Sequence, residues 1–146
     1  PETMGKASQL GSLGEILDLC LLDERLIPVL DFGHLHARDL GALNTPADFR
    51  AVLDKLISAL GYERARHFHA HFSRIAYTDK GEKRHMRFND PGYGPDFALL
   101  APLLLEYGLE PVIICESNGS QADDALIMKR QWEQARDERM EKTNHG

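Results

Sequence analysis

Acidic and histidine side chains stand at the ends of three segments that have the composition of buried strands. The segments cover residues 30–36, 69–73 and 113–117, and six of the seven histidines fall between His34 and His85. Carboxylates and neutral imidazoles are the protein ligands of zinc, manganese and iron. Because a barrel builds one shared site from the ends of neighbouring strands, this pattern predicts a metal-dependent enzyme.

The middle segment carries the densest set of candidate ligands. On a strand over residues 66–73, alternation would place four polar side chains on one face, namely His67, His69, His71 and Ser73. Each imidazole has two nitrogens to satisfy, so buried histidines need partners. Hydrogen-bonded core histidines are the alternative, but acids end the neighbouring strands as well. We therefore expect at least one of His67, His69 and His71 to bind a metal.

Asp31 and His34 stand at the end of the first strand, which we predict over residues 26–32. On a continued strand the two side chains would face opposite ways, but Gly33 lets the chain turn where the strand ends. Both side chains can then reach one site as metal ligands, with a turn or helix cap as the alternative for Asp31. We expect His36 to support this site or to contact substrate.

Two glutamates complete the set of carboxylates. Glu116 directly follows four apolar residues at the end of a strand predicted over residues 110–116. An unpaired carboxylate at that place is costly unless a cation holds it. Glu2 offers a similar acid, although no strand precedes it in the sequence. We assign Glu116 to the metal site, and the same argument would cover Glu2 only if a strand preceded it.

A polar, glycine-containing segment over residues 76–94 is predicted to be a loop, and its length favours a function over simple connection. Its charged run contains Lys80, Glu82, Lys83, Arg84 and His85. His85, assisted by Glu82, is a candidate metal ligand, and the three cations could bind a substrate phosphate. A solvated loop is the alternative interpretation.

Helices and strands alternate along the chain with short connections. Helices are predicted over residues 12–22, 46–60, 96–107 and 121–142, and the three strands lie between them. Ser12 with Glu15 has the spacing of a capping box, and Thr45 before Pro46 marks the start of a second helix. This alternation is typical of an α/β domain with a parallel sheet, and we treat residues 1–146 as one domain.

Composition narrows the class of protein. The apolar fraction of 42% and the charged fraction of 27% are ordinary for a globular protein, and the net charge of −6 gives no basic signature for nucleic acid. The longest apolar stretch, residues 98–105, is too short to cross a bilayer, so no membrane partner is expected. Cys20 and Cys115 lie in separate apolar runs, which favours free thiols and a cytoplasmic protein.

Taken in order, these segments resemble the endonuclease IV family of zinc-dependent apurinic/apyrimidinic endonucleases, and more broadly the xylose-isomerase-like barrels. The matching pieces are residues 2–6, 31–34 and 71–73, His85, and residues 114–117. The resemblance implies the C-terminal half of an eight-stranded (β/α) barrel, about its last three to four βα units. It also implies a DNA repair hydrolase that cuts the phosphodiester on the 5′ side of an abasic site.

The resemblance also implies roles for single residues. The family's metal ligands fall on Glu2, Asp31, His34, His71 (or His69), His85 and Glu116, and the catalytic carboxylates would be Glu2 and Glu116. One zinc, with manganese or iron as alternatives, would keep a full ligand set of Glu2, Asp31, His71 and Glu116. A second would keep His34 and His85, and a third would lose both of its histidines. The family has an aspartate where this chain has Lys83, so Glu82 is the candidate replacement.

Members of this family are about twice as long as this chain, and the match lies in their C-terminal half. We therefore interpret the chain as a fragment, a truncated reading frame or an engineered piece, and expect little or no activity from it alone. Its free half-barrel edges favour a homo-oligomer. The alternative functions are a sugar isomerase or epimerase on the same barrel, and an inert metal-binding module.

Overall fold

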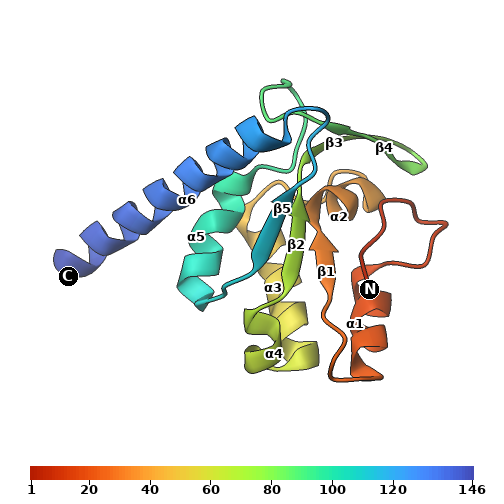
Figure 1. The fold of residues 1–146 in the computed structure, drawn as a ribbon, viewed down its shortest axis with the longest axis horizontal. Coiled ribbons are helices and arrows are strands. Elements are labelled where there is room, and N and C mark those ends of the chain that lie inside the picture. The colour runs from red at the N-terminus through yellow and green to blue at the C-terminus, as the bar shows by residue number, and fades with distance from the viewer.

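Three parallel strands form the centre of the molecule in the computed structural model, which describes all residues 1–146. The strands β1 (Val29–Asp31), β2 (His69–Phe72) and β5 (Val112–Cys115) pair in the order β1-β2-β5. Their carboxyl ends therefore meet at one edge of the sheet (Figure 1). The predicted α/β architecture with a parallel sheet is confirmed, whereas three strands alone do not make half of a barrel.

Six helices lie around this sheet (Figure 1). They are α1 (Leu13–Leu21), α2 (Phe32–Arg38), α3 (Pro46–Leu60), α4 (Tyr62–Arg66), α5 (Phe97–Tyr107) and α6 (Gln121–Asn144). The far end of α6 projects from the body of the molecule (Figure 1). None of the six combines the length and the apolar character that crossing a membrane requires.

The apolar core lies between the sheet and the helices. Ala70 and Phe72 point from β2 into it, and the Phe72 ring lies 5.2 Å from that of Phe97 and 5.8 Å from that of Phe32. Each such buried ring contributes about 1.5–3 kcal/mol relative to exposure. On the opposite face, no helix covers Val112 and Ile114, which are 55% and 50% exposed. The predicted division of β2 into an apolar and a polar face is correct.

The strands β1 and β2 are shorter than predicted. The helix α2 begins at Phe32, where β1 was expected to continue, and α4 extends to Arg66, where β2 was expected to begin. Asp31 caps α2 by accepting the His34 backbone N–H at 2.8 Å, so Phe32 already begins a helix. The prediction that Gly33 turns the chain is wrong, since Gly33 lies within α2. The prediction that His67 shares the strand face is also wrong, because His67 ends α4 and β2 starts at His69.

The segment predicted to be a loop folds mainly as a hairpin. β3 (Arg74–Thr78) pairs antiparallel with β4 (Gly81–Met86), and Ile75 stands opposite His85. This hairpin extends across the carboxyl ends of the parallel strands (Figure 1). Its consecutive charges obscured the pattern in which Ile75 and Met86 are buried, Glu82 and His85 are half-buried, and Lys83 and Arg84 are exposed.

The helix starts predicted from capping residues are confirmed. Ser12 and Glu15 form the reciprocal hydrogen bonds of a capping box at α1, and Thr45 with Asp48 does the same at α3. Gly61 ends α3 with a φ of 77°. Local hydrogen bonding of this kind depends on neighbouring residues only, which is why the sequence predicts it well.

Thr45→Ala is expected to lower the free energy of unfolding by about 1 kcal/mol. The substitution removes the hydroxyl that accepts the Asp48 backbone N–H. Denaturant unfolding monitored by circular dichroism measures the change, with Thr143→Ala in the exposed end of α6 as the control. Equal stability of the Thr45 variant and the parent would contradict a capping role.

Candidate metal centre

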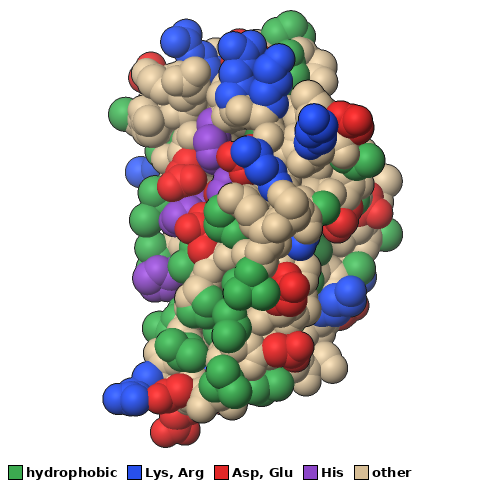
Figure 2. Space-filling view, turned by 90° about the vertical axis from the view of Figure 1, so that its right-hand side faces the viewer, with side chains coloured by type: hydrophobic (Ala, Val, Ile, Leu, Met, Phe, Trp, Pro, Cys, Tyr) green, Lys and Arg blue, Asp and Glu red, His purple; other side chains and the backbone are tan.

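Two groups of potential ligand atoms lie at the carboxyl edge of the sheet. One group contains Glu2, Asp31, His71 and Glu116, and the other contains Asp31, His34 and His85. Within each group the ligand atoms all lie within 4.8 Å of one another, and Asp31 belongs to both. Figure 2 shows histidine and acidic side chains together on one face, with lysine and arginine side chains gathered above them.

The sheet itself positions the first group. Glu2 bridges to Val29 beside β1, Asp31 ends β1 directly opposite His71 of β2, and Glu116 follows β5. His71 Nδ1 lies 2.9 Å from Glu2 Oε1, 3.3 Å from Glu116 Oε1 and 3.8 Å from Asp31 Oδ2. Three carboxylates around one imidazole form a compact set of donors that suits a divalent cation.

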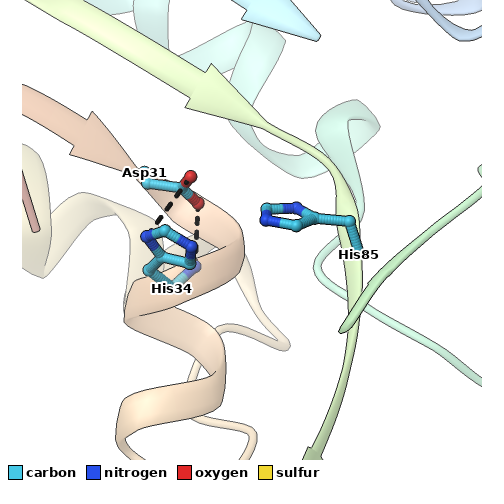
Figure 3. A group of neighbouring side chains, drawn as sticks. All are labelled: Asp31, His34 and His85. Carbon is cyan, nitrogen blue, oxygen red and sulfur yellow. Dashed lines mark hydrogen bonds and ion pairs between the residues drawn. The ribbon is translucent and has the colours of Figure 1, made fainter. Parts of the chain in front are cut away.

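Helix α2 and the hairpin supply the second group. His34 lies in the first turn of α2, while His85 reaches from β4 toward it and toward Asp31 (Figure 3). The two imidazole rings have their centroids 5.4 Å apart, and His34 Nδ1 lies 3.4 Å from Asp31 Oδ2. Glu82 of β4 adds a further carboxylate, with its Oε2 3.2 Å from His34 Nε2.

Two buried polar residues orient the imidazoles of the second group. The backbone carbonyl of Thr3 accepts a hydrogen bond from His34 Nδ1 at 2.9 Å, and the hydroxyl of Ser73 contacts His85 Nδ1 at 2.7 Å. In a neutral His34, the lone pair is therefore on Nε2, and His85 can adopt the same tautomer. Hydrogen bonding at the opposite ring nitrogen is characteristic of histidines that bind metals.

Asp31 has the most unusual environment of the candidate ligands. It is fully buried, Oδ1 accepts the His34 backbone N–H, and Oδ2 has no hydrogen-bond partner. Burial raises the pKa of Asp31 from 3.8 to about 6, against the opposing effects of His34 and His85. A buried carboxylate with one bare oxygen is costly unless a cation compensates it. The surrounding carboxylates of Glu2, Glu82 and Glu116 add more negative charge, so the residues fit a divalent metal.

Close backbone packing holds this centre together at Gly33. A Cβ at Gly33 would stand 3.2 Å from Asp31 Oδ1 and 3.2 Å from both the carbonyl and the hydroxyl oxygen of Ser73. Glycine therefore suits this position because α2 packs tightly on the end of β2, and not because the chain turns.

The remaining predicted site residues lie outside both groups. His69 is exposed on β2, two residues before His71 on the same face. Lys80, Lys83 and Arg84 are exposed on the hairpin or its turn. His36 is buried, and its Nδ1 accepts the Leu43 backbone N–H at 3.1 Å; burial lowers its pKa. His36 belongs to none of the ligand groups and lines a separate cavity.

No role for Thr3 or Ser73 was predictable from the sequence. Both are fully buried, and Thr3 Oγ1 also accepts the Asp31 backbone N–H at 2.9 Å. The one indication in the sequence was that each is a small hydroxyl residue close to a segment with candidate metal ligands. Nothing in the sequence indicated which imidazole each one would contact.

Ser73→Ala is expected to weaken zinc binding by roughly 10–100-fold, the range found when a partner of a metal-binding histidine is removed. The variant leaves His85 Nδ1 without its 2.7 Å contact, so the ring loses its fixed orientation. Competition with a chromogenic chelator measures the affinity. Ser120→Ala, which disturbs only a contact to Asp124, is the control, and unchanged affinity in Ser73→Ala would refute the orienting role.

Comparison with known proteins gives a relative but no activity. No family model matches the chain. The chain is 36% identical over 129 residues, or 88% of its length, to the uncharacterized protein MJ0133 of Methanocaldococcus jannaschii. The match covers 46% of that protein, so the chain spans about half the length of the curated relative it matches.

Proposed function

We propose that this chain carries the metal centre of a zinc-dependent phosphodiester hydrolase that acts on abasic sites in DNA. Manganese and iron are the alternative metals for the same ligand types. The observation that carries the proposal is the pair of ligand groups sharing the buried Asp31, one of whose oxygens has no hydrogen-bond partner. The resemblance to the endonuclease IV family supplies the substrate class.

A shared carboxylate between two ligand groups favours phosphodiester hydrolysis over sugar isomerisation. Two neighbouring divalent metals stabilise the attacking and the leaving oxygen of an in-line displacement. Glu2, Asp31, His71 and Glu116 would hold one metal, and Asp31, His34 and His85, with Glu82, the other. A sugar isomerase of the alternative type uses one divalent metal and a carboxylate base, and would leave one group without a role.

The chain's own residues have separate tasks in this proposal. Glu2 and Glu116 are only partly buried, so their carboxylates can contact the reacting atoms and accept a proton from water. Thr3 and Ser73 keep two imidazoles in one orientation. The exposed cations of the hairpin, Lys80, Lys83 and Arg84, can pair with DNA phosphates on either side of the abasic site.

The sheet belongs to a (β/α) barrel in this proposal, with further strands from a second copy or another chain. Its support is the parallel strand order, the helices on one face and the ligands at the carboxyl ends. No strand pairs with the outer edge of β5, and Val112 lies exposed there.

Light scattering at micromolar concentration should detect a dimer or larger species, and Val112→Lys should shift the distribution toward monomer. Leu22→Lys, on the surface after α1, is the control, and a monomeric parent protein would contradict assembly from a second copy of this chain.

Incision of a defined DNA duplex tests the function. Zinc-loaded protein in stoichiometric excess over a duplex with one abasic site should cut on the 5′ side of that site, slowly but measurably. Chelation and Glu116→Gln should each abolish the cut, and an undamaged duplex should stay intact. Turnover of a sugar phosphate without DNA incision would favour the isomerase, and bound zinc with neither activity would identify an inert metal-binding module.

A further inference from the structure

A second cavity lies between α2, β3 and α5 and shares no residue with the candidate metal groups. Its volume is about 400 Å³, enough for a small planar ligand. The segment before α5 lines one side through Tyr93, Gly94 and Asp96, and β3 lines another through Ile75 and Tyr77. The metal centre does not account for this cavity.

His36 presents an unused hydrogen-bond donor to this cavity. The residue is 3% exposed, and its Nδ1 accepts the Leu43 backbone N–H at 3.1 Å. Nδ1 is thus unprotonated and the ring proton is on Nε2, for which the protein supplies no acceptor. A Cβ at Gly94 would lie 3.2 Å from Nε2, so the glycine leaves this nitrogen open to the cavity.

The rest of the lining defines the kind of ligand that can bind. Two aromatic rings stand at the surface, with Tyr77 39% and Tyr93 37% exposed, and the interior is apolar at Leu43, Ile75 and Leu99. Asp96 uses Oδ1 to cap α5 through the Ala98 backbone N–H, which leaves Oδ2 as an acceptor. No lysine or arginine lines the cavity, so a phosphate or another anion has no partner in it.

We propose that this cavity binds an uncharged nucleobase that carries an exocyclic amino group. The ring stacks on Tyr93, an acceptor of the base receives the His36 Nε2–H, and the amino group donates to Asp96. A ring acceptor beside an amino donor is the pattern on adenine and cytosine, whereas uracil has no amino group. The base can come from a free nucleoside or from an unpaired position of a single strand, which share this chemistry.

Calorimetric titration with nucleosides in the presence of a chelator tests the proposal apart from any metal-dependent function. Adenosine or cytidine should bind at least about tenfold more tightly than uridine, because uridine leaves the Asp96 acceptor unpaired. Tyr93→Ala should weaken binding by about tenfold, as expected for one lost stacking contact. Gly94→Ala should also weaken binding, because the added methyl group obstructs His36 Nε2. Gly94 does not have a positive φ, so its backbone tolerates alanine.

A matched control and a second ligand complete the experiment. Tyr62→Ala removes a tyrosine of similar exposure, 40%, that lies outside the cavity, and it should leave the affinity unchanged. Tighter binding of a short adenine oligonucleotide than of adenosine would support a single-strand source, and equal affinity would support a free nucleoside. Absence of nucleoside binding, or equal binding by the parent, Tyr93→Ala and Gly94→Ala, would overturn the proposal.

Discussion

Asp31→Asn is expected to abolish zinc binding by this chain, together with the thermal stabilisation expected from zinc. Asp31 is the one residue common to both ligand groups, so a neutral amide there weakens both sites at once. The expected loss of affinity exceeds about 100-fold, the upper end of the range for residues that merely support a ligand. Zinc at one hundred times its Kd would stabilise the parent by about 2.7 kcal/mol, and the variant should show almost none of this increment.

Differential scanning fluorimetry with and without zinc measures this effect, and calorimetry gives the affinities. Asp124→Asn is a matched control, because Asp124 is also buried but only accepts hydrogen bonds from Phe88 and Ser120. That variant can be less stable, yet its zinc increment should equal that of the parent. A full zinc increment in Asp31→Asn would contradict a metal centre built around this carboxylate.

The contribution of Asp31 to the stability of the metal-free protein is expected to fall as the pH rises from about 4 to about 6. Burial raises the pKa of Asp31 in the folded protein from 3.8 to about 6, so the folded state holds a proton that the unfolded state releases. The stabilisation is complete below pH 3.8 and is lost as the pH passes through about 6. The shift corresponds to roughly 3 kcal/mol in the free energy of unfolding.

Denaturant unfolding at several pH values in the presence of a chelator isolates this contribution. The difference between the parent and Asp31→Asn should change by roughly 3 kcal/mol across the window, because titration of the other groups cancels in the comparison. Zinc should reverse the trend, since a cation favours the ionised carboxylate. A pH-independent difference between the two proteins would mean that Asp31 does not titrate as its burial requires.

Four of the six helices, α1, α3, α5 and α6, were predictable because their signals are local, whereas α2 and α4 were not predicted. The capping residues Ser12 and Thr45 and the helix-ending Gly61 act through hydrogen bonds and backbone angles within a few residues of each helix end. The alternation of strand and helix likewise indicated a parallel sheet, and parallel strands place their carboxyl ends together. For that reason Asp31, His71 and Glu116 could be grouped as candidate ligands from the sequence.

The contacts between distant segments were decided only by the tertiary structure. His67 and the residues of the hairpin were misassigned, because a run of polar residues has no apolar periodicity that distinguishes helix end, strand and loop. His34 and His36 were expected near one site, yet α2 continues through both residues. At about 100° per residue they point in nearly opposite directions, one to His85 and one to the second cavity.

The sequence by itself therefore determined the residue types and the strand ends that can build a metal site. Only the folded chain decided that Asp31 is shared between two ligand groups, that Ser73 and Thr3 orient the imidazoles, and that Asp31 Oδ2 is left without a partner. The physical reason is that burial and hydrogen-bond partners depend on packing between residues about 12 to 31 positions apart in the chain.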